Sequence, residues 1–299
     1  MIELRVASAL DDFETWAKVK SRVVPDEPVT AEQLIASNEP GRLLLLAYLD
    51  GVVAGCGIGG RSAFGEKAFI MARVLPEFRC RGVGSELVRA LAEHGRALGR
   101  DGVNSFVEWH DEPSIRFAEK LGLTEVDYQL EQVRLVGAEA RPELPAGIEV
   151  VAIADRRDEL LAKAWPVAQQ GYEDMPLPGA VTHPRQSWLR DEATRPDGTF
   201  VAFDDGELVG YAGMTDHANG DATAEHGLTV VRRDRRRRGI ARALKLSQLH
   251  WASSTGVVEL ITWTQKGNEA MQALNRSLGY VDHARVITYQ GALPSPPGE

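Results

Sequence analysis

The sequence has little cysteine, no long apolar run and no excess of positive charge. Only Cys56 and Cys80 occur among its 299 residues, so neither a disulfide framework nor a metal-ligand spacing is expected. The aliphatic run at residues 43–49 is far shorter than the roughly 18 apolar residues of a membrane span. Residues 1–13 do not have the basic-then-apolar pattern of a secretory leader. We therefore expect a cytoplasmic protein that binds no metal and no membrane.

One segment contrasts with the acidic balance of the chain. The formal net charge is −9, which disfavours a general polyanion binder, because non-specific nucleic-acid affinity comes mostly from phosphate neutralisation. Residues 232–245 (RRDRRRRGIARALK) nevertheless hold seven arginines and a lysine. This run could bind an anion, be a solvated surface loop or form a nucleic-acid patch. No aromatic stacking platform or second basic cluster accompanies it, so we favour anion binding and expect no nucleic-acid partner.

The chain is an internal duplication. Residues 44–60 (LLLAYLDGVVAGCGIGG) parallel residues 199–215 (TFVAFDDGELVGYAGMT) at an offset of 155, and residues 73–91 parallel residues 230–248 at an offset of 157. Repeats of this kind are read before local structure because they decide the architecture. The seam is the Pro/Gly-rich segment 137–147. The sequence therefore predicts domains at 1–136 and 147–293, with 293–299 as a frayed tail.

Each half has the same expected order of elements. An opening strand leads into helical segments, a hairpin that turns at Asp-Gly, and a third long strand. An Arg/Gly loop then opens an amphipathic helix, and a further strand and a short helix ending in Leu-Gly complete the unit. This order predicts an α/β protein in which each half is a mixed, mostly antiparallel sheet flanked by helices.

The Arg/Gly loop has the sequence R-x-x-G-x-[GA] in both halves. The first N–H groups of a helix have no intrahelical partner and lie at the positive end of its dipole, so a phosphate can bind there. Arginines add bidentate hydrogen bonds. Together with the closing segment 268–280 (NEAMQALNRSLGY), these loops resemble those of the GNAT superfamily of N-acetyltransferases, here as a tandem pair over essentially the whole chain.

The resemblance implies acetyl-CoA (coenzyme A) as cofactor, with its pyrophosphate on the loop backbone and its pantetheine arm along the preceding strand. In the second half the implied contacts are Thr229, Val230, Val231, Arg236, Arg237, Arg238, Gly239, Ile240, Ala241 and Asn268. In the first half they are Val74, Arg79, Arg81, Gly82, Val83 and Gly84. Helix capping alone would also explain Asn268, as it would Asp111 at the matching position of the first half.

The resemblance also implies a glutamate base fourteen residues before the loop glycine. That position is Glu225 in the second half and Ala68 in the first, so we expect the second half to be catalytic and the first to be a degenerate copy. A solvated residue at the start of a strand is the alternative for Glu225. His226 is a competing base, but strand alternation points it to the opposite face. The tyrosine with which the family often protonates the thiolate is replaced by Asn275, a poor proton donor, which leaves the general acid open.

The expected acceptor site involves a lid at residues 169–179 (QQGYEDMPLPG). Tyr172 and Asp174, with Glu173, would bind a cationic amine, while Met175 and Pro176 would form an apolar wall. An irregular surface loop explains the same residues.

The sequence therefore predicts an acyl-CoA-dependent N-acetyltransferase that acts on a small amine by direct attack on the thioester in its C-terminal half. An acetyltransferase of the mycothiol synthase type, which has a similar tandem arrangement, and a non-catalytic acyl-CoA sensor are the alternatives. We expect a monomer or a homodimer.

Overall fold

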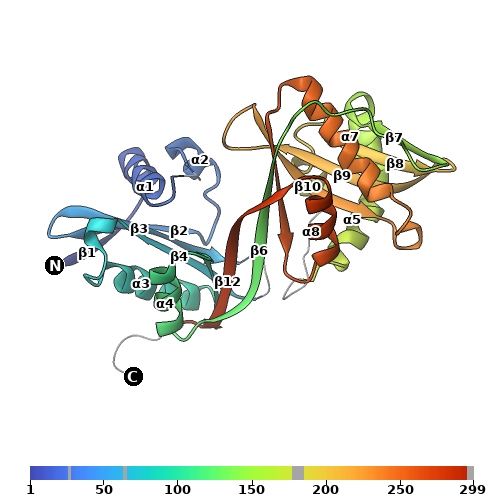
Figure 1. The fold of residues 1–299 in the computed structure, drawn as a ribbon. Coiled ribbons are helices and arrows are strands. Elements are labelled where there is room, and N and C mark those ends of the chain that lie inside the picture. Colours follow the sequence, from blue (N-terminus) through green and yellow to red (C-terminus); the bar gives the residue numbers. More distant parts are fainter. Residues whose placement is uncertain (26–27, 63–65, 177–184, 295–299) are drawn as a thin grey trace. The chain divides into compact units, whose positions relative to one another are not determined.

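The fold is described from a computed structural model that covers residues 1–25, 28–62, 66–176 and 185–294 (Figure 1). The contacts divide the chain into two compact units. One unit consists of Met1–Asp127 with Val286–Glu299, and the other of Tyr128–Arg285. No helix in the described part of the chain is long and apolar enough to cross a membrane. No cluster of His, Cys, Asp and Glu side chains that could hold a metal ion occurs there either.

The first unit is a sheet in the order β1-β2-β3-β4-β5-β12. Neighbouring strands are antiparallel except β4 and β5, which are parallel. Helices α1 and α2 lie on one face and α3 and α4 on the other (Figure 1). The elements up to the end of the first sequence repeat are β1 (Ile2–Val6), α1 (Leu10–Val23), α2 (Ala31–Ala36), β2 (Leu43–Leu49), β3 (Val52–Arg61), β4 (Ala68–Val74), η1 (Pro76–Phe78), α3 (Val83–Ala97), β5 (Gly102–Glu108), α4 (Glu112–Lys120) and β6 (Thr124–Leu135).

The second unit repeats this plan in the order β7-β8-β9-β10-β11-β6. Its one parallel pair is β10 and β11. The mixed, mostly antiparallel α/β architecture predicted for each half is thus confirmed. The elements are β7 (Ile148–Ala152), η2 (Ala154–Arg156), α5 (Arg157–Glu173), α6 (Arg185–Asp191), β8 (Phe200–Asp204), β9 (Glu207–Asp216), β10 (Thr223–Val231), η3 (Arg233–Arg235), α7 (Ile240–Thr255), β11 (Glu259–Gln265), α8 (Glu269–Ser277) and β12 (Val281–Ala292).

The last strand of each sequence repeat belongs to the sheet of the other unit. Strand β6 pairs with β11 along residues 129–135, and β12 pairs with β5 along residues 286–292. The contact units therefore differ from the predicted limits 1–136 and 147–293. Because the two halves are copies, each terminal strand fits the sheet of the other, as in domain swapping. The predicted frayed tail also starts with a packed residue, since Leu293 is buried; residues 295–299 lie outside the described residues.

The hairpin turns are those the sequence predicted. Asp50 and Gly51 have φ of 52° and 82°, and Asp205 and Gly206 have φ of 50° and 80°. Positive φ at both central residues is the type I′ geometry that Asp-Gly favours between antiparallel strands. The two turns fix the register of β2 with β3 and of β8 with β9.

The two faces of the second sheet carry different cores. On the face covered by α5 and α6, called here the α5 face, Trp188, Tyr211 and Val230 pack with Leu160 and Leu161. On the other, the α7 face, a cluster of Ala202, Val209, Ala212, Val231, Ile240 and Leu244 packs beneath α7. Alternate residues of β9 and β10 therefore point to opposite faces, which determines on which side each candidate site residue lies.

Candidate active site

The loop between β10 and α7 has a backbone suited to an anion. Arg237 and Gly239 have φ of 66° and 81°, and the first helical bond of α7 runs from the Ala243 N–H to the Gly239 carbonyl. Within the described residues, the N–H groups of residues 237–242 have no backbone acceptor. A non-glycine residue at positive φ is costly and is retained where the local structure requires it. A phosphate can bind at a helix start of this kind; that one binds here stays a prediction.

The first half has the same loop backbone. Cys80 and Gly82 have φ of 58° and 86°, and α3 begins after Gly82 as α7 begins after Gly239. In each loop the first arginine donates from Nε to the last carbonyl of the preceding strand: Arg79 to Val74 at 3.2 Å, and Arg236 to Val231 at 2.9 Å. Of the other first-half candidates, Arg81 is exposed, Val83 is buried and Gly84 lies beside Val74. The loop geometry alone therefore does not distinguish the two halves.

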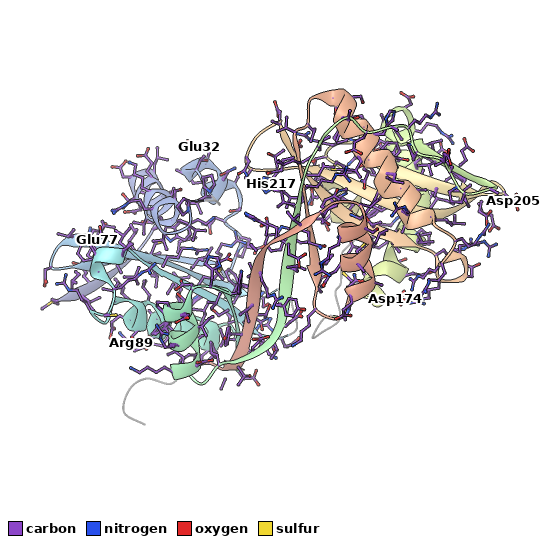
Figure 2. The ribbon with its side chains drawn as sticks, viewed as in Figure 1. Glu32, Glu77, Arg89, Asp174, Asp205 and His217 are labelled. Carbon is purple, nitrogen blue, oxygen red and sulfur yellow. The ribbon has the colours of Figure 1, made fainter. Side chains whose placement is uncertain are left out.

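Most of the arginine run is paired with carboxylates. Arg233 and Arg236 bind Asp174, which lies at the end of α5 (Figure 2). Arg235 and Arg238 bind Asp204 at the end of β8. Arg237 and Arg242 are exposed and have no ion pair among the described residues, although Arg242 donates to the Ser277 hydroxyl, so these two arginines are left to meet an incoming anion. The carboxylates therefore hold the arginine side chains of the loop in place, and the backbone N–H groups at the start of α7 remain without an acceptor among the described residues.

Strands β10 and β11 part at the position of Glu225. Their last parallel pair is Glu225 with Ile261, and a β-bulge between His226 and Thr229 shifts the register of β10 against β9. A bulge re-aims side chains and frees backbone groups, and bulges are frequent beside active sites. In the first half, β4 pairs with β3 without such a shift. This is the first structural difference between the two sites.

Three buried polar atoms on β10, β11 and α8 lack hydrogen-bond partners in the described part of the chain. Thr229 Oγ1 on β10, Thr264 Oγ1 on β11 and Asn275 Oδ1 on α8 are buried and have no hydrogen-bond partner among the described residues. Buried polar atoms without partners are rare and call for an explanation. A ligand with amide groups, such as a pantetheine arm, would satisfy them, so the residues present fit coenzyme A. Val230, Val231 and Ile240 pack their side chains into the cores on either side, and Ala241 is partly buried, so any contact there comes from backbone.

Glu225 is a half-buried carboxylate on the α5 face. Its side chain makes no hydrogen bond or ion pair among the described residues. Burial, with a smaller effect from the nearby carboxylate of Glu131, raises its pKa. A raised pKa suits a general base near neutral pH. The matching residue, Ala68, is fully buried and apolar.

His226 lies on the α7 face, as alternation predicted, and is fully buried. Its Nδ1 is 2.9 Å from Gln248 Oε1 on α7, and its Nε2 is bonded to the Tyr280 hydroxyl. Burial lowers its pKa well below the usual value. These bonds make His226 a structural residue in this conformation.

Lys245 adds an uncompensated charge to the same core. It is 1% exposed, its Nζ has no hydrogen-bond partner among the described residues, and Nζ is 5.5 Å from the centroid of the Tyr280 ring. Burial lowers its pKa to about 7. At the offset of 157, the residues that match this polar cluster in the first half are all apolar: Phe69, Val88, Leu91 and Leu123.

Glu192, directly after α6, is a residue that the sequence reasoning missed. Its Oε1 accepts from the Leu228 N–H in the bulge at 3.0 Å and lies 3.5 Å from the Tyr211 hydroxyl, while its Oε2 is 3.4 Å from the Tyr172 hydroxyl. Burial raises its pKa to about 7. No motif marks this glutamate; the nearest signal is the aromatic Trp188, four residues earlier.

The predicted lid residues separate into two groups. Tyr172 lies at the α5 face, where its hydroxyl accepts from Trp188 Nε1 at 3.0 Å. Asp174 lies at the arginine loop, and the two guanidinium groups there lower its pKa. Its charge is already matched, which favours a role in holding the loop over one in binding the acceptor. Glu173 is paired with Arg233, and residues 177–179 of the lid lie outside the described residues.

The two asparagines of α8 differ in their surroundings. Asn275 is fully buried, and its Nδ2 donates to Gln132 Oε1 at 2.9 Å. Asn268 occupies the N-cap position of α8 but makes no side-chain cap bond, whereas Asp111 caps α4 by accepting from the Ser114 N–H. The Asn268 side chain therefore does not cap the helix. Its contact with the coenzyme stays a prediction.

Comparison with known proteins agrees with this geometry. The acetyltransferase (GNAT) family matches residues 9–123 and 159–280. A mycothiol acetyltransferase of Thermomonospora curvata is 29% identical over 275 residues, which cover 88% of each chain. One of Frankia casuarinae is 26% identical over 298 residues, with 91% of this chain and 80% of the relative covered.

Solved structures share the tandem fold. A GNAT protein of Sphaerobacter thermophilus superposes with a TM-score of 0.80 at 19% identity, over 100% of this chain and 98% of that one. A tandem GNAT protein from the clavulanic acid biosynthesis pathway gives a TM-score of 0.74 at 20% identity, with both chains fully covered.

Proposed function

Because the chain belongs to the GNAT family of acetyltransferases, we propose that it is an acetyl-CoA-dependent N-acetyltransferase for a small amine, with its chemistry in the second half. The observation that carries the proposal is the difference between two otherwise matching sites. Glu225, the bulge and the orphaned Thr229 hydroxyl occur together at the parting of β10 and β11. The first half has Ala68 and an unbroken β4 at the same place.

Different residues of the second half bind the coenzyme and transfer the proton. The free N–H groups of residues 237–242, with Arg237, hold the pyrophosphate, and the backbone of residues 229–231 and Asn268 hold the remainder of the coenzyme. When bound, acetyl-CoA supplies the thioester carbonyl that the amine attacks. Glu225 removes a proton from the ammonium form of the acceptor, so that the neutral nitrogen can form the new C–N bond as the C–S bond breaks. Asn275, which is fully buried with its Nδ2 bonded to Gln132, cannot supply a proton to the leaving sulfur.

The acceptor enters from the α5 face. Glu225, Glu131 and Glu192 all lie in the second unit near this face, and the first and third have raised pKa values because of burial. A concentration of carboxylates favours a positively charged acceptor. This supports an amine that is protonated at neutral pH.

A second candidate is an enzyme of the mycothiol acetyltransferase type, because the relatives named above carry that name along most of this chain. A screen of primary amines, including the amine precursor of mycothiol, separates the two candidates. Release of free thiol from acetyl-CoA would be followed for each amine. Acetylation of the mycothiol precursor far above all other amines would favour the second candidate, and binding of acetyl-CoA without turnover on any amine would identify a sensor instead of an enzyme.

A further inference from the structure

The carboxyl group of Glu192 lies on a gap in the sheet made by two facing glycines. A Cβ atom built on Gly213 of β9 would be 2.7 Å from Glu192 Oε1, and one built on Gly227 of β10 would be 2.8 Å from it. Any larger residue at either place would move the carboxyl group. The matching residues in the first half are Ile58 and Ile70, which leave no such gap. The arrangement is therefore specific to the half that carries Glu225.

Three groups from three elements contact the Glu192 carboxyl group. The Leu228 N–H in the bulge and the hydroxyls of Tyr172 and Tyr211 contact its oxygens, and Trp188 Nε1 holds the Tyr172 hydroxyl in turn. The side chain is nevertheless partly exposed. A carboxyl group held in one orientation by several hydrogen bonds is preorganised to bind a ligand.

The position of the bulge relative to the cofactor loop places Glu192 at the reacting end. If the pyrophosphate lies on residues 236–241 and the pantetheine arm follows residues 229–231, the thioester arrives beside Gly227 and Leu228. Glu225 lies two residues before Gly227 on the same face of β10, about 6 to 7 Å along the strand. The acceptor nitrogen therefore has a carboxyl group on each side.

We propose that Glu192 is a second acceptor-binding residue, whose carboxylate holds the ammonium group of the substrate at the bulge while Glu225 takes its proton. The substrate class is then primary amines that are cationic at neutral pH. This inference rests on the proposed function. It assigns binding to Glu192 and proton transfer to Glu225, and these two roles have different kinetic consequences.

The ionisation of Glu192 should make binding of the amine depend on pH. Its pKa is raised to about 7, first by burial, against the lowering effect of the Leu228 N–H and the two tyrosine hydroxyls. The titratable groups that face it are the hydroxyls of Tyr172 on α5 and Tyr211 on β9. Arg157 on α5 donates to the carbonyls of residues 189, 190 and 193, on either side of Glu192 in the sequence. Below pH 7 the carboxyl group is protonated and loses its attraction for an ammonium group, so amine binding should weaken there.

The test compares Glu192→Gln, Gly227→Ala and Glu225→Gln with the wild type. The probes are n-butylamine and the amine of the screen that the wild type acetylates fastest, at saturating acetyl-CoA. In Glu192→Gln the KM for the amine should rise roughly 10- to 100-fold, as expected for loss of a charged hydrogen bond, with kcat and the KM for acetyl-CoA changed less than about twofold. The fall of kcat/KM below pH 7 should become shallower, because only Glu225 still titrates there. Gly227→Ala keeps the carboxylate but displaces it, so it should raise the KM for the amine in the same direction.

Asp191→Asn is the matched control, because it removes the exposed carboxylate of the neighbouring residue, which among the described residues pairs only with Arg190. It should behave as the wild type. A wild-type amine KM and an unchanged pH profile in Glu192→Gln, while Glu225→Gln loses turnover, would overturn this inference and leave the proposed function standing. A wild-type protein that binds acetyl-CoA but acetylates no amine would overturn both.

Discussion

Replacing Lys245 by methionine should stabilise the protein in a pH-dependent way. The lysine is 1% exposed, and its Nζ has no hydrogen-bond partner among the described residues. Burial lowers its pKa from 10.5 to about 7. At roughly 1.4 kcal/mol per pKa unit, that shift is on the order of 5 kcal/mol of free energy of unfolding. Methionine keeps the length of the side chain and removes the charge.

The direction in which this destabilisation changes with pH follows from proton linkage. The unfolded lysine keeps its proton up to pH 10.5, whereas the folded lysine releases it above about 7. Folding therefore costs most below pH 7, the cost falls by roughly 1.4 kcal/mol per pH unit between 7 and 10, and it vanishes above 10.5. The gain in Lys245→Met should be several kcal/mol at pH 7 and should shrink along the same slope.

The assay is urea unfolding of both proteins between pH 6 and 10, followed by tryptophan fluorescence. Lys163→Met, which removes an exposed lysine paired with Glu159, is the control and should give a small gap with little pH dependence. A difference in the free energy of unfolding between Lys245→Met and the wild type that stays constant from pH 6 to 10 would show that Lys245 does not titrate as described. A variant that is less stable than the wild type at every pH would show that the buried charge does not destabilise the protein.

Three further outcomes follow from the site and the fold. Glu225→Gln should lower turnover at neutral pH by roughly 10²–10⁴ with acetyl-CoA affinity unchanged, and the loss should narrow at high pH, where more amine is neutral; wild-type turnover would remove Glu225 from the mechanism. Ala68→Glu should not restore turnover to Glu225→Gln, because Ala68 is fully buried and β4 has no bulge; restored thiol release would show a second competent site. A chain ending at Arg285 lacks the segment of β12 that pairs with β5, so amide hydrogen exchange should show lost protection in β5 and retained protection in β11; unchanged protection of β5 would contradict the strand exchange.

The sequence predicted the repeat and its turns well because these depend on local chemistry. Asp-Gly pairs require positive φ at adjacent residues and set the hairpins, and the strand–loop–helix pattern around Gly82 and Gly239 follows from amphipathic spacing and the glycine itself. Strand alternation was enough to place His226 on the face opposite Glu225. These features do not depend on distant parts of the chain.

The partners of β6 and β12 could not be predicted in the same way. An alternating strand shows which of its faces is buried but not whose sheet edge it joins, and in a duplicated chain both edges accept either copy. Glu192 and Lys245 were missed for a related reason. The environment of each is made by residues that are distant in the sequence. Glu192 lies against Gly213, Gly227 and Leu228, and Lys245 lies over the ring of Tyr280.

For Asp174 the sequence suggested a role in binding the acceptor, whereas its neighbours in the structure suggest a role in holding the loop. An acidic residue in a loop near a candidate site suggested an acceptor ligand, but the structure places it between Arg233 and Arg236. Seven arginines in one segment need compensating charge, and carboxylates at the end of α5, on β8 and on β9 supply part of it. An ion-pair partner 59 residues away in sequence cannot be read from composition.

The central claim is that the coenzyme loop of the second half, and not that of the first, supports turnover. Gly82 and Gly239 have matching backbone conformations, with φ of 86° and 81°, so leucine at either position should disturb its loop to a similar degree. Steady-state thiol release from acetyl-CoA by Gly82→Leu and Gly239→Leu, each checked for native circular dichroism, compares them directly. We expect Gly239→Leu to lose turnover and Gly82→Leu to retain it. Loss of turnover in Gly82→Leu with activity kept in Gly239→Leu would show that the first half is the catalytic one.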